Sequence, residues 1–461
     1  MEHDAHGYWL REAGGASPVA PAAGDIDADV VVLGGGYTGM WTAWQLLERA
    51  PDCRVVLLEA DICGHGPSGR NGGFCETLWT SLPSLIERFG AERAFAACEA
   101  SSESVRAIGA WCDAEGIDAW YTHAGYVMAS TTPEEDAKLD AILAVAPRER
   151  VVPLDGAEVR VRCDSPRFRR GVFVPDDATV QPARLALGLR RRLLERGVRI
   201  HERSRVRALR VNGPGEVVAE TASARVRAGA AVLALNAATR GVRPLRSRLS
   251  VTSSHIVLTE PVPDVLEAIN WTGGEGVTDG RLLVHYFRTT RDHRIAFGWG
   301  GGRLAWGARL DGRVEVDAEV VRRTHDALLE LFPALAGRRI AHAWGGPIDV
   351  SPSHLPQVGT LADAPVHYAF GYTGNGVGPS HLAGRILSGL ALGAHDGDTR
   401  LALVDPTPAF VPPEPFAWVG GTIVRRALLR AERSLAAGRR PDPLTRAVAA
   451  APRALGMHVS R

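Results

Sequence analysis

The stretch "DVVVLGGGYTGMWTAWQLLERAPDCRVVLLEA", residues 29–60, decides the fold. Residues 29–33 form a short, mostly β-branched run, the composition of a strand that is buried on both faces. Gly34, Gly36 and Gly39 follow with the spacing G-x-G-x-x-G, which allows a tight turn, close approach of a pyrophosphate, and close packing of the next helix. From Tyr37 and Thr38 onward the apolar spacing is helical, and the helix N-terminus is predicted to face the phosphates.

A second predicted strand, residues 54–58, ends at Glu59, which lies 25 positions after Gly34. An acid at this place accepts hydrogen bonds from the hydroxyls of an adenosine ribose, and it disfavours NADP because a carboxylate repels the extra phosphate. The stretch therefore predicts a dinucleotide site for NAD or FAD. A glycine-rich strand-to-helix turn without a ligand is the alternative.

A second glycine-rich loop, "CGHGPSGRNGG" at residues 63–73, follows the ribose acid. It resembles the loop of FAD-dependent oxidoreductases of the D-amino-acid oxidase superfamily, most closely the gamma-glutamylputrescine oxidase-like and aminophosphonate oxidoreductase-like branch. The matching positions are Gly64, Gly66, Ser68, Gly69, Arg70, Asn71, Gly72 and Gly73. The resemblance implies that Ser68 serves a phosphate and that Arg70 and Asn71 lie near the flavin ring. The alternative is an Arg-Asn turn at the surface.

Later segments extend the resemblance. Val206 matches the position whose backbone meets the adenine in the family, and "RAGAAVLALNAATRGV" (227–242) resembles a second flavin-side strand and turn. "AWGGPIDVSPSHLPQVG" (343–359) and "YAFGYTGNGVGPSHLAGRILSGLALG" (368–393) resemble the C-terminal signature. The cofactor contacts implied there are Gly374, Asn375, Gly376 and Val377. A helix that begins near Val377 would direct its positive end at the flavin.

The resemblance implies an α/β chain with an FAD-binding, Rossmann-like domain of the glutathione-reductase type. That domain is expected from residues 27–100, 165–245 and 340–405, after an N-terminal arm at 1–26. Residues 101–164 and 246–339 are expected to form an inserted α+β substrate domain whose sheet covers the flavin.

Residues 406–461 are predicted to form a proline-rich tether and a basic helical extension. After residue 421, this extension contains nine arginines but only two acidic residues, Glu432 and Asp442. We expect this helix to pack its apolar stripe on its own domain, as most amphipathic helices do. Contact with an anionic membrane is the alternative.

The overall composition is that of an ordinary globular protein. The 461 residues are 45% hydrophobic and 23% charged, with a net charge of +1, so no nucleic-acid partner is expected. Six cysteines form no CxxC pair, so we expect reduced thiols and no metal site. No apolar run has the length of a signal peptide or a membrane span, which makes a cytoplasmic location the default expectation.

Candidate catalytic residues lie in "RLLVHYFRTTRDHRIAFGWGG", residues 281–301, which alternates like a hairpin of the substrate-domain sheet. Tyr286 and Arg288 are predicted on one face and His285 on the other, and His255 is a fourth candidate. Which face meets the flavin is left open. For each histidine, the alternative is a hydrogen-bonded core or surface residue.

Two departures from relatives bear on the chemistry. Monomeric sarcosine oxidase-like members have a lysine in the strand that matches "RIAFGW", where this chain has Ala296 or a close neighbour. They also bind FAD through a cysteine near the segment that matches "WGGPID", whereas no cysteine follows Cys163. We therefore expect non-covalent FAD. Lys138, the one lysine, lies in a charged stretch that predicts a solvated helix away from the flavin.

The resemblance implies FAD-dependent oxidation of the C–N bond of an amine or amino acid. A hydride passes to flavin N5, the imine is hydrolysed, and oxygen or another acceptor reoxidises the flavin. An arginine-rich roof is compatible with an anionic amine substrate. The alternatives are a flavin-dependent monooxygenase, although "TGNGVGPS" lacks the usual Gly-Asp pair, and a non-catalytic or membrane-recruited flavoprotein subunit.

Overall fold

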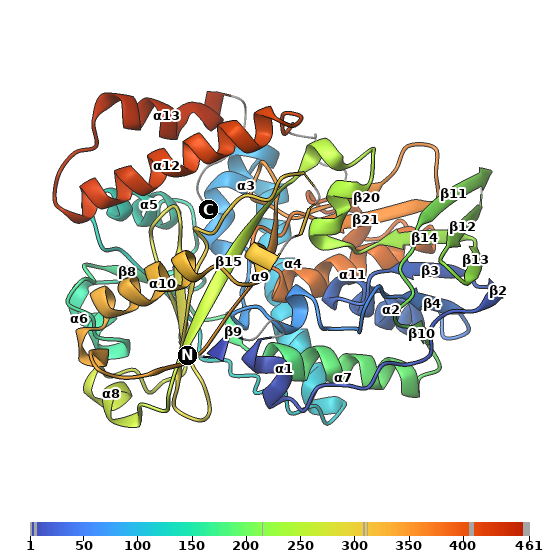
Figure 1. The fold of residues 1–461 in the computed structure, drawn as a ribbon, viewed down its shortest axis with the longest axis horizontal. Coiled ribbons are helices and arrows are strands. Elements are labelled where there is room, and N and C mark those ends of the chain that lie inside the picture. Colours follow the sequence, from blue (N-terminus) through green and yellow to red (C-terminus); the bar gives the residue numbers. More distant parts are fainter. Residues whose placement is uncertain are drawn as a thin grey trace.

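Two large sheets organise the chain (Figure 1), one of six strands and one of nine. The computed structural model describes residues 2–3, 7–213, 215–307, 309–310, 312–404 and 410–454. The six-stranded sheet lies in the right half of Figure 1, and much of the nine-stranded sheet lies to its left. No helix among these described residues is long and apolar enough to cross a membrane.

The six-stranded sheet contains the opening stretch of the sequence. Its strands, in spatial order, are β10 (Arg199–His201), β4 (Val55–Leu58), β3 (Val30–Leu33), β14 (Ala230–Leu233), β21 (Val366–Phe370) and β20 (Gln357–Thr360). β3 is parallel to both of its neighbours, β4 and β14. Val30 and Val32 pack into one core, whereas Val31 and Leu33 pack into another. The continuous apolar run thus reflects burial on both faces, as predicted.

Helices and a small sheet cover the two faces of this sheet. The helical layer contains α2 (Tyr37–Arg49), α4 (Ala91–Ala114), α7 (Pro182–Glu195) and α11 (Val377–Ala391), with α3 (Leu82–Phe89) beside α4. The other face packs against the four-stranded sheet of β11 (Ala208–Gly213), β12 (Glu216–Glu220), β13 (Ala224–Ala228) and β2 (Gly24–Asp27). The order β3, glycine turn, α2, β4 also confirms the predicted succession of strand, turn, helix and strand.

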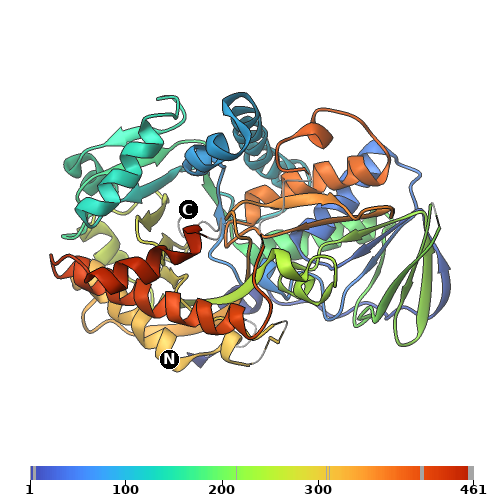
Figure 2. The ribbon, with the colours of Figure 1, turned by 90° about the horizontal axis from the view of Figure 1, so that it is seen from above.

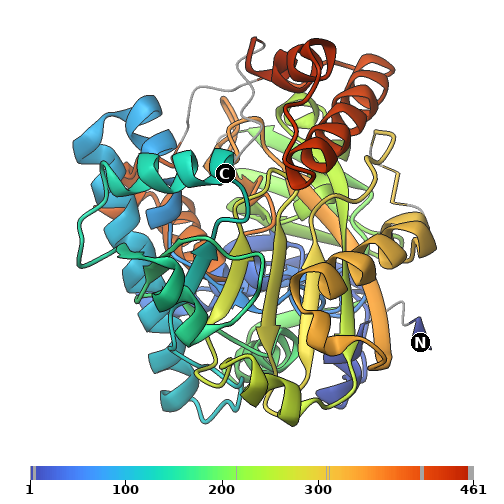
Figure 3. The same ribbon diagram turned by 90° about the vertical axis from the view of Figure 1, so that its left-hand side faces the viewer.

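The nine-stranded sheet forms the other half of the molecule. Its strands, in spatial order, are β1 (Glu2–His3), β19 (Ile340–Val350), β15 (Ser250–Thr259), β18 (Ile295–Trp299), β17 (His285–Thr289), β16 (Gly276–Asp279), β6 (Tyr126–Ala129), β8 (Gly171–Val174) and β7 (Val152–Leu154). One face packs against α6 (Gly156–Arg162), α8 (Pro263–Ala268) and α10 (Ala318–Leu331). Figure 3 shows α10 in front of these strands.

The sheet corrects two segment boundaries that we drew from the sequence. β8 and β19 are strands of the nine-stranded sheet, although residues 165–245 and 340–405 were assigned to the FAD-binding domain. The physical reason is strand pairing, because β19 is hydrogen-bonded along its length to β15. A short pair of strands, β5 (Phe74–Cys75) and β9 (Ala178–Thr179), links the second glycine-rich loop to the segment before α7.

The C-terminal extension forms two helices, α12 (Phe416–Ala436) and α13 (Pro443–Ala454). They lie along the nine-stranded half of the molecule in Figure 2. Ala427 and Leu428 are buried, as expected of a helix that packs on its own domain, whereas Val419 and Ile423 are exposed. Parts of the predicted tether and extension, residues 405–409 and 455–461, lie outside the described residues.

Candidate active site

A cavity of about 1250 Å³ lies between the six-stranded and nine-stranded sheets. Its walls include the glycine turn between β3 and α2, the second glycine-rich loop and the inner face of the nine-stranded sheet. Most of the predicted cofactor contacts line it: Gly34, Gly36, Tyr37, Thr38, Glu59, Ser68, Arg70, Asn71, Gly72, Val206, Gly374, Gly376 and Val377. Segments far apart in the sequence therefore meet at one site.

Glu59 lies at the dinucleotide end of this cavity. One carboxylate oxygen accepts a hydrogen bond from the backbone N–H of Gly35 (2.7 Å), and the other accepts one from that of Asp61 (2.8 Å). Burial raises the pKa of the Glu59 carboxyl, and the hydrogen bonds oppose this effect. The side chain is thus fixed in place with lone pairs left for further donors, as a ribose acceptor requires.

Ser68 joins the two glycine-rich segments. Its hydroxyl oxygen accepts a hydrogen bond of 2.9 Å from the backbone N–H of Tyr37, the first residue of α2. A Cβ atom at Gly36 would lie 3.0 Å from the same oxygen, so a larger residue would crowd this junction. The loop is therefore held against the helix N-terminus, where anionic groups are favoured.

Three predicted cofactor contacts, Gly39, Gly73 and Asn375, are not among the residues that line the cavity, and their contact with the cofactor stays a prediction. A Cβ atom at Gly39 would lie 1.9 Å from the carbonyl oxygen of Gly34, so this glycine lets α2 pack on β3. Gly73 has a φ of +78°, and a Cβ atom there would lie 2.1 Å from the carbonyl oxygen of Val180. These two glycines thus allow the close backbone packing that shapes the walls.

The residues present fit an adenine dinucleotide of the flavin type. Two helices, α2 and α11, begin at the cavity, and their N-cap residues, Gly36 and Gly376, have no side chain that could cap the first turn. Their backbone N–H groups can therefore serve a pyrophosphate at one end and an electron-rich ring at the other. Gly374 and Gly376 leave the backbone at the ring end without side chains, so a flat ring can approach it.

Tyr286 is the predicted catalytic residue that lines the cavity. Its hydroxyl shares a hydrogen bond of 2.7 Å with the hydroxyl of Ser254 on β15. A Cβ atom at Gly298 would lie 2.0 Å from the tyrosine ring, and one at Gly72 would lie 2.9 Å from it. The ring is therefore clamped between β18 and the second glycine-rich loop, next to the expected flavin site.

Arg288 shares the face of Tyr286, but its guanidinium turns toward the chain. It donates hydrogen bonds to the carbonyl oxygens of Val180, Gly73 (3.3 Å) and Thr289 (3.0 Å). Burial lowers the pKa of Arg288 to about 9. Because it does not line the cavity, our assignment of Arg288 to catalysis is corrected: it braces the end of the glycine-rich loop.

The two candidate histidines also lie behind the wall. His285 alternates with Tyr286 along β17, so it points to the opposite face, where its Nδ1 atom lies 2.6 Å from a carboxylate oxygen of Asp279. His255 is buried, and its Nε2 atom accepts a hydrogen bond of 3.1 Å from the backbone N–H of Asp317. Neither lines the cavity, so the structure favours the core-residue alternative for both.

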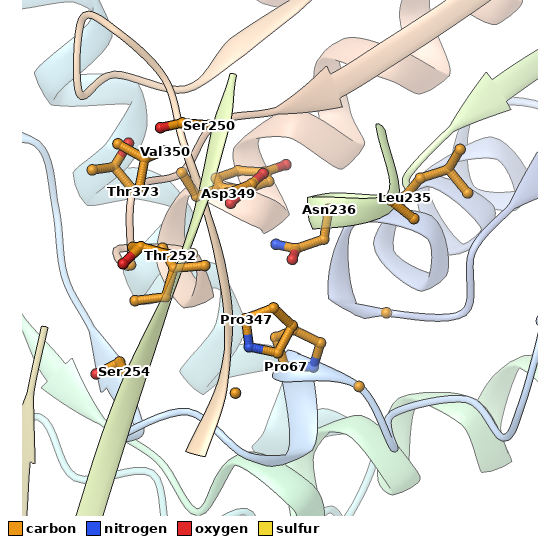
Figure 4. A pocket seen from close by; sticks show the side chains of 18 of the residues that line it. Pro67, Leu235, Asn236, Ser250, Thr252, Ser254, Pro347, Asp349, Val350 and Thr373 are labelled. Carbon is orange, nitrogen blue, oxygen red and sulfur yellow. The ribbon is translucent and has the colours of Figure 1, made fainter. Parts of the chain in front are cut away.

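Asp349 and Asn236 are cavity residues that sequence reasoning did not select. Figure 4 shows them side by side, Asn236 after β14 and Asp349 near the end of β19. An oxygen of Asp349 accepts a hydrogen bond of 2.5 Å from the backbone N–H of Gly371. Burial raises the pKa of Asp349 to about 7, although hydrogen bonds from Gly371 and Asn236 oppose the shift. The sequence pattern that could have identified Asp349 is an acidic residue in the otherwise apolar segment "WGGPID" quoted above.

Lys138 requires a further correction. It lies on α5 (Pro133–Leu143), a helix as predicted, but it is half-buried and lines the cavity. The buried side of α5 packs Leu139 and Ile142 into the hydrophobic core, which holds the helix close to the protein, so a charged sequence does not place every side chain in water. The single lysine is therefore part of the cavity wall, and its separation from the flavin stays a prediction.

A dinucleotide turn, a ribose-facing acid, a second glycine loop and a sheet that roofs the cavity together define a nucleotide-dependent oxidoreductase. The model of the DAO family, described as FAD dependent oxidoreductase, matches residues 29–390. The chain therefore belongs to the DAO family of FAD-dependent oxidoreductases, as its motifs predicted, and FAD is its cofactor.

Individual relatives agree with this assignment. The chain is 29% identical over 442 residues to "Probable oxidoreductase OrdL" of Rhizobium meliloti, covering 92% of this chain and 95% of that protein. It is 29% identical over 402 residues to gamma-glutamylputrescine oxidoreductase of Escherichia coli, covering 85% and 90%. Among solved structures, glycine oxidase from Geobacillus kaustophilus has the same fold, with a TM-score of 0.65, 21% identity, and coverage of 80% and 96%.

Proposed function

We propose that the protein oxidises the C–N bond of an amine or amino acid. The observation that carries this proposal is one continuous cavity that joins the dinucleotide turn to the inner face of the nine-stranded sheet. When bound, FAD supplies a hydride acceptor for the carbon next to the amine nitrogen, and water then hydrolyses the imine. The similarity to gamma-glutamylputrescine oxidoreductase and to glycine oxidase supports an amine as the substrate.

The side chains at this cavity have roles that follow from their surroundings. Tyr286 and Ser254 form a fixed hydroxyl pair on the inner face of the sheet, so they can orient the nitrogen of an amine by hydrogen bonds. Apolar neighbours such as Met128 and Ile256 exclude water. An ammonium group brought into such surroundings loses hydration, which lowers its pKa and favours the neutral amine that can be oxidised.

Non-covalent binding of FAD is part of the proposal. All six cysteines fall within the described residues, each is free, and none of them lines the cavity. A thioether link through cysteine therefore has no support in this site. Retention would depend on Glu59, the two helix N-termini and the glycine-rich loops.

Anaerobic mixing with a panel of primary and secondary amines and amino acids tests the proposed function. We expect loss of the flavin absorbance near 450 nm with at least one class of amine, followed by recovery when an electron acceptor is added. Reduction by NADH or NADPH, with no response to any amine, would contradict the proposal and favour a monooxygenase.

A further inference from the structure

The C-terminal extension forms part of the cavity wall. Ala417, Gly421, Val424 and Leu428 of α12 line the cavity together with Arg425. These residues lie beyond residue 390, where the match to the family model ends. The substrate side of the cavity is therefore bounded by a segment outside the matched part of the family.

Several contacts fix α12 in this position. The backbone N–H of Leu283 donates a 3.0 Å hydrogen bond to the carboxylate of Glu432, and the rings of Trp306 and Trp418 meet edge to face with centroids 5.6 Å apart. A Cβ atom at Gly421 would lie 2.5 Å from a methyl carbon of Leu304, so the helix packs closely on the chain after β18. The position of Arg425 is thus set by the fold.

Arg425 is a half-buried cation bound only to carbonyl groups. Its Nε atom donates to the carbonyl oxygen of Gly302 (2.6 Å), and its Nη2 atom donates to that of Gly301 (2.6 Å). No carboxylate among the described residues lies within ion-pair distance of it. Burial, together with the nearby Arg303 and Arg323, lowers the pKa of Arg425. The carboxylates of Asp317 and Glu319 oppose this shift from beyond ion-pair distance, but they already form ion pairs with Arg303 and Arg323. An anion that binds Arg425 directly would therefore be favoured.

Two other arginines that line the cavity, Arg70 and Arg281, differ from Arg425 in this respect. Arg70 pairs with Glu315 at 3.2 Å, and Arg281 pairs with Asp279 at 3.3 Å. Their charges are already balanced by carboxylates. Arg425 is therefore the best candidate of these three for an incoming anion, and its Nη1 atom forms no hydrogen bond within the described part of the chain.

The position of Arg425 relative to Tyr286 follows from the chain. A Cβ atom at Gly302 would lie 2.1 Å from the carbonyl oxygen of Ser253, so the Arg425 anchor lies against β15. The next residue, Ser254, shares a hydrogen bond with Tyr286. Gly302, which holds Arg425, thus packs beside the strand whose Ser254 contacts Tyr286, and Arg425 and Tyr286 line the same cavity.

We propose, on the basis of the proposed function, that Arg425 binds an anionic group of the amine substrate. The chemical class is an amine that also has a carboxylate or phosphonate, with the nitrogen directed to Tyr286 and Ser254. A guanidinium forms strong, charge-assisted hydrogen bonds with either anion. Arg425 would thus be a specificity-determining residue supplied by the C-terminal extension.

Equilibrium binding of anions that cannot be oxidised tests the proposal without turnover. Butanoate and methylphosphonate would be titrated into the FAD-loaded protein, with binding followed by the flavin absorbance and by calorimetry. We expect Arg425→Gln to weaken binding of the preferred anion by about 10- to 150-fold, the range for hydrogen bonds to charged groups. Arg425→Lys should retain part of the affinity. The adjacent Arg426 is exposed, so Arg426→Gln is the matched control and should bind as the wild type does.

Activity assays distinguish a failure of this inference from a failure of the proposed function. With pairs of amines that differ only in an anionic group, such as 4-aminobutanoate and butylamine, Arg425→Gln should raise KM for the anionic member and leave the neutral member unchanged. Normal FAD content and circular dichroism would show that the variant is folded. Anion binding that is absent in the wild type, or equal in Arg425→Gln, would overturn the inference. Anion binding that depends on Arg425, with no amine oxidised, would defeat the proposed function alone.

Discussion

Replacement of Glu59 by alanine should weaken FAD binding strongly. The carboxylate is held by the backbone N–H groups of Gly35 and Asp61, at 2.7 and 2.8 Å, and it lines the dinucleotide end of the cavity. Water can replace it as the acceptor for these two donors because the residue is only half-buried. The net loss is then the charged acceptor of a ribose hydroxyl, about 1.5–3 kcal/mol, which raises the Kd about 10- to 150-fold.

Titration of FAD into FAD-free protein, followed by quenching of flavin fluorescence, measures this Kd directly. Glu59→Gln should not restore binding, because its amide N–H₂ would face one of the two backbone donors. Glu267 is exposed on α8, so Glu267→Ala is the control and should bind FAD as the wild type does. A Kd for Glu59→Ala within twofold of the wild type would refute the assignment of this acid to the ribose.

Three further predictions concern the cofactor and the walls of its site. Acid precipitation should release FAD into the supernatant; flavin that stays with the precipitate would disprove non-covalent binding. Gly39→Ala should lower both FAD content and the urea midpoint, because its Cβ atom would lie 1.9 Å from a backbone oxygen, whereas Gly397→Ala, with open space around it, should change neither. The raised pKa of Asp349, about 7 against 3.8, implies stability that is full below pH 3.8 and lost as the pH rises to 7. Asp349→Asn should therefore gain stability over the wild type as the pH rises from 5 to 8, by up to about 3 kcal/mol in urea unfolding of the FAD-free protein; an equal difference at both pH values would contradict this.

Local patterns predicted the dinucleotide end of the site well. Each glycine motif, with the strand or helix beside it, lies within about forty residues, and its backbone geometry depends on neighbours in the sequence. Glu59 could be placed because a strand of known length ends there. The fold followed from the same segments, since alternating burial of Val30, Val31 and Val32 on two faces is what a continuous apolar strand predicts.

The substrate end was less predictable because its contacts are long-range. Strand alternation separated Tyr286 from His285, but which of them faced the cavity depended on how the nine-stranded sheet packs against the loop at Gly72. Asp349 meets Asn236 across more than a hundred residues, and Arg425 reaches Gly302 from the extension. No spacing rule connects residues that are so far apart, so their contacts could not be predicted from the sequence.

The strand order of the six-stranded sheet has a consequence for biosynthesis. β3 and β4 leave the ribosome early, whereas β14 and β21, which complete the sheet on the other side of β3, come from residues 230–233 and 366–370. β14 is the strand that pairs with β3 on that side, and at ordinary rates of translation roughly 10 to 40 s separate the synthesis of β3 from that of β14. During this time the apolar edge of β3 has no permanent neighbour, so the nascent chain depends on chaperones or transient contacts. The ring end of the FAD site, at Gly374 and Gly376, is complete only after these residues have been synthesised.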